Sequence, residues 1–270
     1  EGVSSVSPYS KLLFEMHKFL LPRISYDCLV SWGRYVLEKH FIKWGVERSK
    51  SCVIPGAVDT NEFNPEIDGS DVRKTLPEAE KIILAAKPMY FTNALGMAHI
   101  IKSMKLVVEE FPDCKLVLGG DGRMKGKLVA LTNKLGLKDK LKFVGWISQK
   151  EMPKFYRAAD VIVDSFIFTH PGSITALESL ASGTPNVMTE IECLPGEINV
   201  PPSDIAVLSK PGDEKSIADG IIALLEDSKL GKKIGNNAVD FVEKNFSIEV
   251  VTEKYLDLYS KVLDNYPAKY

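Results

Sequence analysis

The chain has 270 residues, of which 45% are hydrophobic and 26% are charged, and its formal net charge is −2. These values are typical of a soluble globular protein and exclude an overall basic field that would attract nucleic acid. No run approaches the roughly 20 apolar residues that a membrane span needs. The four cysteines form no CxxC pair, and three of them lie in apolar runs. We therefore expect buried free thiols and a cytoplasmic location.

The opening part of the chain carries few regular elements. Apolar spacing predicts helices over residues 10–21 and 35–44, and apolar runs predict strands over 26–32 and 52–54. These elements cannot close a parallel sheet by themselves, so they look like the last portion of an α/β domain. Residues 55–77 are rich in Pro, Gly, Asp and Asn, which predicts a linker.

Beyond the linker, strands and helices alternate regularly. The expected strands span 81–86, 114–118, 141–144, 161–163, 186–189 and 206–208. The expected helices span 97–111, 124–135, 150–159, a stretch that opens near 172, and then 216–227, 229–244 and 248–264. This alternation predicts an α/β fold with a Rossmann-like, doubly wound parallel sheet, in which ligands bind beyond the carboxyl ends of the strands.

The segment from His170 to Pro185 is the best candidate for an anion site. It follows a buried strand, and its small residues lead into a helix. A helix N-terminus presents unpaired backbone N–H groups and a partial positive charge. The N–H groups of Gly172, Ser173 and Ile174 are therefore predicted to face a bound phosphate, with an ordinary helix start as the alternative.

Six motifs, taken together, resemble one family. Glu-Ser-Leu-Ala-Ser-Gly-Thr-Pro at 178–185 is similar to the signature E-A-M-A-x-G-x-P of the retaining, nucleotide-sugar-dependent glycosyltransferases of family four. The other motifs lie at 52–65, 116–122, 143–147, 152–163 and 210–213. Their order and spacing match the family, and the resemblance runs from about residue 26 to 262. It implies the GT-B fold, in which two Rossmann-like domains face each other across a cleft.

The resemblance implies a division of the chain. Residues 1–55 are expected to be the tail of the acceptor-side N-terminal domain, and 56–77 the interdomain linker. Residues 78–246 are expected to bind the donor, and 247–270 to form a helix that packs back toward the N-terminal part. Because the chain begins with Glu1 rather than methionine, we expect a truncated chain that is inactive alone. Any association with the inner membrane face is expected mainly through the missing N-terminal half.

The resemblance also assigns site residues. Glu178 is expected to accept hydrogen bonds from the donor's ribose, although Thr175 and Glu178 also fit a capping box. His170 stands where the family often has glutamate and is expected near the sugar or phosphate, with a plain loop residue as the alternative. Lys87 replaces an arginine and is expected to stabilise the leaving diphosphate without the arginine fork; a solvated surface lysine is the alternative. Leu95 stands where a second cation is usual.

Two further turns are expected near the donor. The glycine-rich turn of Gly120, Asp121 and Arg123 lets the backbone approach a ligand closely, and Arg123 can replace the second cation. Gly145 and Trp146 are expected beside the nucleobase, with core or rim packing as the alternative for Trp146.

The resemblance implies a glycosyltransferase that moves a hexose from a UDP- or GDP-linked donor to a hydroxyl of a glycan or lipid-linked acceptor, with retention. The sequence holds no Asp-x-Asp motif, so we expect neither a metal nor a cofactor. Leu95 and His170 suggest the main alternative, a nucleotide-sugar-binding or interaction protein in which catalysis is degraded. A nucleotide-sugar epimerase of the same fold is a third possibility, against which the signature at Glu178 argues.

Overall fold

The computed structural model describes residues 8–165, 173–190 and 204–264. The chain divides into two compact units: residues 57–250, here called the sheet unit, and residues 1–56 with 251–270, here called the small unit. The predicted packing of residues 1–50 against the last helix, like the other predicted domain boundaries, stays a prediction. None of the helices in the described ranges is long and apolar enough to cross a membrane.

The small unit contains a short parallel strand pair. Its elements are α1 (Pro8–Leu20), η1 (Leu21–Arg23), β1 (Leu29–Ser31), α2 (Arg34–Val36), η2 (Leu37–Phe41), η3 (Arg48–Lys50) and β2 (Ser51–Val53). The helix expected over 35–44 is one α-helical turn that widens into the π-helical turn η2. Strands β1 and β2 pair with Val30 opposite Cys52.

Two of the predicted free thiols touch each other in the small unit. The Sγ atoms of Cys28 and Cys52 are 3.5 Å apart, and both residues are half-buried. Burial, together with the hydrogen bond and charge interaction with Cys28, raises the pKa of Cys52 to about 11. Cys114 is buried in the sheet unit, as expected, whereas Cys193 lies outside the described residues.

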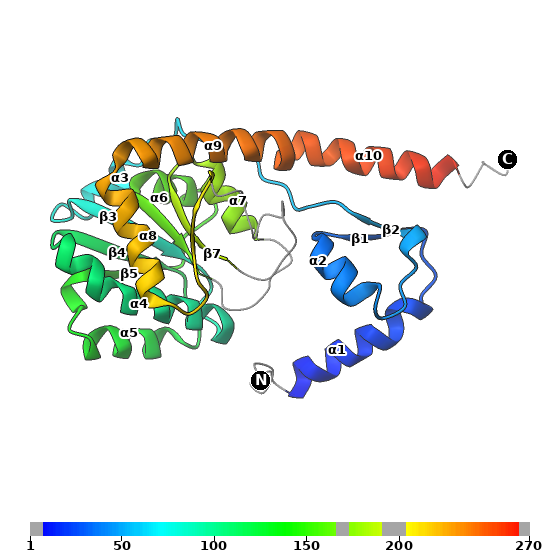
Figure 1. Ribbon diagram of the computed structural model, residues 1–270, viewed down its shortest axis with the longest axis horizontal. Helices are drawn as coiled ribbons and strands as arrows, with labels where there is room; N and C mark the ends of the chain where they lie inside the picture. The colour runs from blue at the N-terminus through cyan, green and yellow to red at the C-terminus, as the bar shows by residue number, and fades with distance from the viewer. Residues whose placement is uncertain (1–7, 166–172, 191–203, 265–270) are drawn as a thin grey trace. The chain divides into compact units, whose positions relative to one another are not determined.

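The sheet unit is built on a six-stranded sheet in which all the pairs are parallel (Figure 1). The strands are β3 (Lys81–Ala86), β4 (Cys114–Gly119), β5 (Leu141–Gly145), β6 (Val161–Asp164), β7 (Asn186–Thr189) and β8 (Val207–Ser209). Their order is β5-β4-β3-β6-β7-β8. The chain therefore winds outward from β3 in one direction and then from β6 in the other. The boundary between these two strands is the topological switch point, where ligands bind in sheets of this kind.

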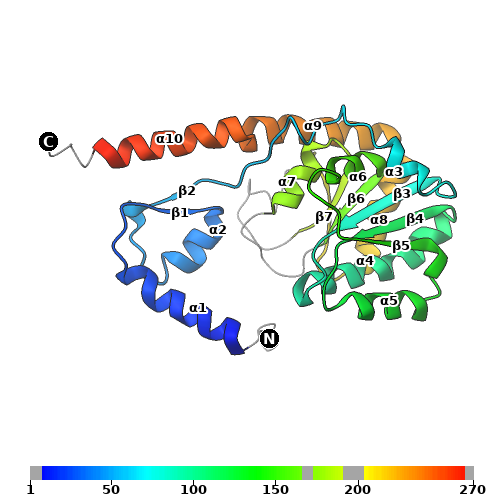
Figure 2. The ribbon, with the colours of Figure 1, turned by 180° about the vertical axis from the view of Figure 1, so that it is seen from behind.

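Helices cover both faces of the sheet (Figure 2). The helices of the sheet unit are α3 (Ser70–Lys74), α4 (Phe91–Glu110), α5 (Lys125–Lys134), η4 (Lys138–Lys140), α6 (Met152–Ala158), α7 (Ile174–Ala181), α8 (Glu214–Glu226) and α9 (Ser228–Phe246). Helix α10 (Ile248–Asp264) belongs to the small unit from residue 251 onward. Alternate residues of β3 enter two separate cores: Ile83 packs with α4, α5 and α8, and Leu84 packs with α6, α7 and α9. This period of two is what a strand buried on both faces requires.

The segment predicted as a linker contributes to the core of the sheet unit. Val58 and Phe63 are buried there, and residues 70–74 form α3. The backbone of Val58 donates to Phe246 at 2.9 Å and accepts from Ile248 at 3.1 Å, which fastens this segment to the junction of α9 and α10. A helix of five residues is too short to produce a detectable apolar period.

One polar contact explains an aspartate in the motif at 152–163. Asp160 immediately precedes β6, and its Oδ2 accepts from Arg73 Nη2 at 2.6 Å and from the N–H of Ile82 at 2.8 Å. This carboxylate ties the amino end of β6 to β3 and α3, away from the carboxyl ends of the strands. Its role in this fold is structural.

Candidate functional site

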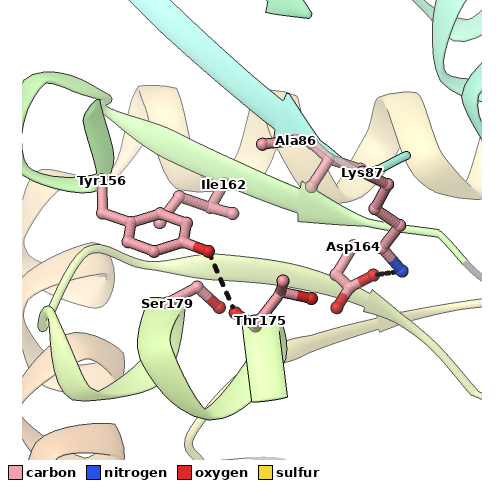
Figure 3. Close-up of a pocket in the computed structure, with 8 residues that line it drawn as sticks. Ala86, Lys87, Tyr156, Ile162, Asp164, Thr175 and Ser179 are labelled. Carbon is pink, nitrogen blue, oxygen red and sulfur yellow. Dashed lines mark hydrogen bonds and ion pairs between the residues drawn. The ribbon is translucent and has the colours of Figure 1, made fainter. Parts of the chain in front are cut away.

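A pocket lies at the switch point, between the carboxyl ends of β3 and β6 and the first turns of α7 (Figure 3). The residues that line it are Ala86, Lys87, Tyr156, Ile162, Val163, Asp164, Thr175 and Ser179. Strands β3 and β6 run side by side because Ile83 pairs with Val161 and Leu84 with Ile162. The pairing brings the residues that end the two strands to the same edge.

A buried ion pair crosses this pocket. Lys87 directly follows β3, and its Nζ pairs with Oδ1 of Asp164, the last residue of β6. The two side chains are only 9% and 5% exposed. Burial lowers the pKa of Lys87, and the Asp164 carboxylate raises it. The predicted cation is therefore at the switch point, and the alternative of a solvated surface lysine is wrong.

Asp164 is a site residue that the sequence reasoning missed. A signal was present, because a charged residue that ends an apolar strand is rarely buried unless it is paired. Nothing in the sequence alone, however, identified Lys87 as the partner, because the two residues meet only through the pairing of β3 with β6.

Glu178 lies in the second turn of α7 and is 4% exposed. Its Oε1 accepts from Gln149 Nε2 at 2.8 Å, and its Oε2 accepts from the hydroxyl of Tyr156 at 3.3 Å. Burial raises the pKa of Glu178, while these two hydrogen bonds lower it. Tyr156 also lines the pocket, so Glu178 is one hydrogen bond away from it.

The capping box considered for α7 does not form. Ser173 is the N-cap, and its Oγ accepts from the N–H of Ala176 at 3.3 Å. Glu178 instead bonds Gln149 and Tyr156. Ser173 and Ile174 open the helix as predicted, whereas His170 and Gly172 lie outside the described residues.

The turns that follow β3, β4 and β5 are tied together. Gly120 has φ +113°, and a Cβ at this position would lie 2.0 Å from the carbonyl oxygen of Lys87. Its N–H donates to the carbonyl of Gly145, which has φ +75°. At Gly120 both the backbone conformation and the close approach require glycine, and at Gly145 the positive φ favours it. These two predicted glycines therefore position the backbone that carries Lys87.

The remaining predicted residues lie on the surface. Asp121 accepts from the N–H of Gly122 and from Lys125 Nζ at 2.9 Å, and the bond to Lys125 lowers the pKa of Asp121. Arg123 is exposed, and Trp146 is 71% exposed, which rules out core packing for its indole. None of these residues lines the pocket described above. Within the described ranges, no group of three or more His, Cys, Asp or Glu side chains could hold a metal ion.

Comparison with known proteins identifies the family. The family model "Glycosyl transferases group 1" matches residues 70–241. The chain belongs to this family. Glycosyltransferase MJ1607 of Methanocaldococcus jannaschii is 30% identical over 189 residues, covering 68% of this chain and 46% of that protein. Mannosylfructose-phosphate synthase of Agrobacterium fabrum is 30% identical over 183 residues, covering 64% and 39%. The chain thus spans less than half of the length of each of these two relatives.

Solved structures confirm the predicted GT-B-type α/β fold. HepE of Anabaena, crystallised with UDP and glucose, is 19% identical and has a TM-score of 0.81, with 93% of this chain and 67% of that chain covered. Sucrose-phosphate synthase of Thermosynechococcus elongatus is 22% identical and has a TM-score of 0.81, with 94% and 62% covered. At these identities the likeness concerns the fold of this group 1 chain.

Proposed function

We propose that the sheet unit binds a nucleoside diphosphate sugar, and that the whole protein transfers the sugar, a hexose, to a hydroxyl acceptor with retention and without a metal. One observation carries the proposal. The Glu178 carboxylate is buried beside the switch-point pocket and is held by Gln149 and Tyr156, which are neutral donors. A carboxylate held in this way keeps acceptor capacity for a ligand's hydroxyl groups. The UDP complexes of the HepE structures support a nucleotide-sugar donor.

The groups that line the pocket or lie beside it suit different parts of such a donor. Glu178 accepts from the ribose hydroxyls. The N–H groups at the start of α7, at Ser173 and Ile174, and the ammonium of Lys87 stabilise the negative charge that grows on the departing diphosphate. The acceptor in the same proposal is a glycan or a lipid-linked sugar. This part of the proposal concerns the whole protein and not the sheet unit alone.

Calorimetric titration tests the binding step. The chain should bind UDP or GDP, and Glu178→Gln should weaken binding by roughly tenfold or more, because a hydrogen bond to a charged group contributes about 1.5–3 kcal/mol. The loss should be much smaller for the 2′,3′-dideoxy nucleotide, which lacks the hydroxyls that Glu178 is proposed to hold. Glu243→Gln, an exposed glutamate on α9, is the matched control. Undiminished binding by Glu178→Gln would contradict the role of this residue.

Turnover by the whole protein tests the rest. NMR of the product's anomeric proton should show the configuration of the donor, and a chelator should leave the rate unchanged. Nucleotide binding without transfer to any acceptor would favour the degraded, binding-only alternative, which the substitution at Leu95 motivates.

A further inference from the structure

The Lys87–Asp164 pair raises a question that the proposed function leaves open. An ammonium that is to hold a diphosphate is already neutralised by a carboxylate within the same pocket. Both charges are removed from water. In such a buried site, two like charges repel each other far more strongly than at the surface. A diphosphate that approaches Lys87 therefore meets the Asp164 carboxylate as well.

We propose that Asp164 is the resident counter-ion of Lys87 and that the donor's diphosphate must displace it, so that Asp164 limits how tightly this site holds a nucleoside diphosphate. The inference rests on the proposed function. Asp164 then acts as a specificity-determining residue, and the direction of its effect on ligand affinity is defined. It opposes an anionic ligand, and it keeps Lys87 charged and in place while the site is empty.

The test is calorimetric titration of UDP and GDP into the wild-type chain and Asp164→Asn. Asparagine keeps the shape and removes the charge. We expect Asp164→Asn to bind the nucleotide roughly tenfold more tightly, because a like charge beside the ligand is lost. Asp164→Glu, which keeps the charge, should not show this gain. Weaker or unchanged binding by Asp164→Asn would overturn the proposal and would indicate that Asp164 only positions Lys87.

Asp160→Asn is the matched control. It removes a carboxylate paired with a cation from the other end of the same strand, so it should lower thermal stability and leave nucleotide affinity unchanged. A similar gain in affinity for Asp160→Asn would attribute the effect to loosened structure and overturn the proposal.

A crystal structure of the wild-type chain with UDP keeps the proposal falsifiable where Asp164→Asn does not fold. We expect Nζ of Lys87 on the diphosphate and more than about 4 Å from the Asp164 carboxylate, beyond ion-pair distance. Bound UDP with the pair intact would overturn the inference while leaving the proposed function standing. Absence of nucleotide binding by both the wild type and Asp164→Asn would instead defeat the proposed function.

Discussion

Two carboxylates are buried in the same site, and they have different kinds of partner. Glu178 and Asp164 are each 4% exposed. Glu178 accepts hydrogen bonds from two neutral groups, whereas Asp164 is paired with the cation Lys87. Neutral donors leave the negative charge uncompensated and available to a ligand, while an ion pair cancels it. Under the proposed function, the chemistry of the partner, and not the depth of burial, distinguishes the carboxylate that recognises hydroxyls from the one that controls a cation.

The largest effect should come from removing the cation. Lys87→Met leaves Asp164 buried without its partner, and breaking a buried pair in this way costs about 3–5 kcal/mol of the free energy of unfolding. Urea unfolding followed by circular dichroism measures it. The exposed pair of Lys215 and Asp219 gives the control, since Lys215→Met removes a cation that solvent already screens and should leave the free energy of unfolding nearly unchanged. Equal losses for the two variants would mean that Asp164 does not depend on its buried cation. The contrast between Asp164 and Glu178 would then disappear.

A smaller loss of stability should follow from displacing α4 from the end of β6, which carries Asp164. Gly96 on α4 packs so closely that a Cβ would lie 2.1 Å from the carbonyl oxygen of Ser165. Gly96→Ala should force α4 away from the end of β6, at a cost of about 1–3 kcal/mol. Gly126→Ala on α5, where a Cβ meets nothing within 4 Å, should instead be neutral or stabilise by up to about 1 kcal/mol. Thermal unfolding of the two variants separates these outcomes.

The sheet was accessible from the sequence because buried parallel strands are continuous apolar runs. Strand β7 spans the residues that the pattern predicts, and β6 extends the prediction by one residue, Asp164. The start of α4 was not accessible: it begins at Phe91 instead of 97. Residues 91–96 include Thr, Asn and Gly, which are poor helix formers, and the close approach of Gly96 to Ser165 is a tertiary contact that no local pattern encodes.

The site was predictable where the family motif covers it and unpredictable where partners come from other elements. Glu178 was found through the signature at 178–185. Its partners were not, because Gln149 is an exposed turn residue and Tyr156 lies on a different helix, α6. Asp164 was missed for the same reason. Pairwise contacts between segments far apart in sequence depend on the register of the sheet, which periodicity does not determine.

A modest effect should follow from removing one neutral donor. Tyr156→Phe deletes the hydroxyl that donates to Oε2 of Glu178 and lies 3.3 Å from the carbonyl of Thr175. We expect a loss of about 1 kcal/mol in the free energy of unfolding, the usual net contribution of one hydrogen bond. Tyr259→Phe on α10, whose side chain is exposed, should leave that free energy unchanged in the same urea titration. A loss of about 3 kcal/mol or more would show that Glu178 depends on its donor as strongly as Asp164 depends on its cation.

The smallest effect concerns the pH dependence of stability. Burial raises the pKa of Glu178 above its ordinary value of 4.5, with the nearby charge of Glu62 adding to the shift. The folded chain therefore binds more protons at this residue than the unfolded chain does between the two pKa values. The stability that Glu178 contributes should decline as the pH rises through that window.

Glu178→Gln cannot titrate, so its stability relative to the wild type should increase as the pH rises from below 4.5 toward neutrality. Urea unfolding of both proteins at a series of pH values gives this difference, and the exposed Glu243→Gln should show none. A difference of the opposite sign would mean that Gln149 and Tyr156 stabilise the charged carboxylate more than burial opposes it. The neutral donors would then stabilise the charged form of Glu178, as Lys87 stabilises that of Asp164. The contrast between the two carboxylates would rest only on what each does toward the bound donor.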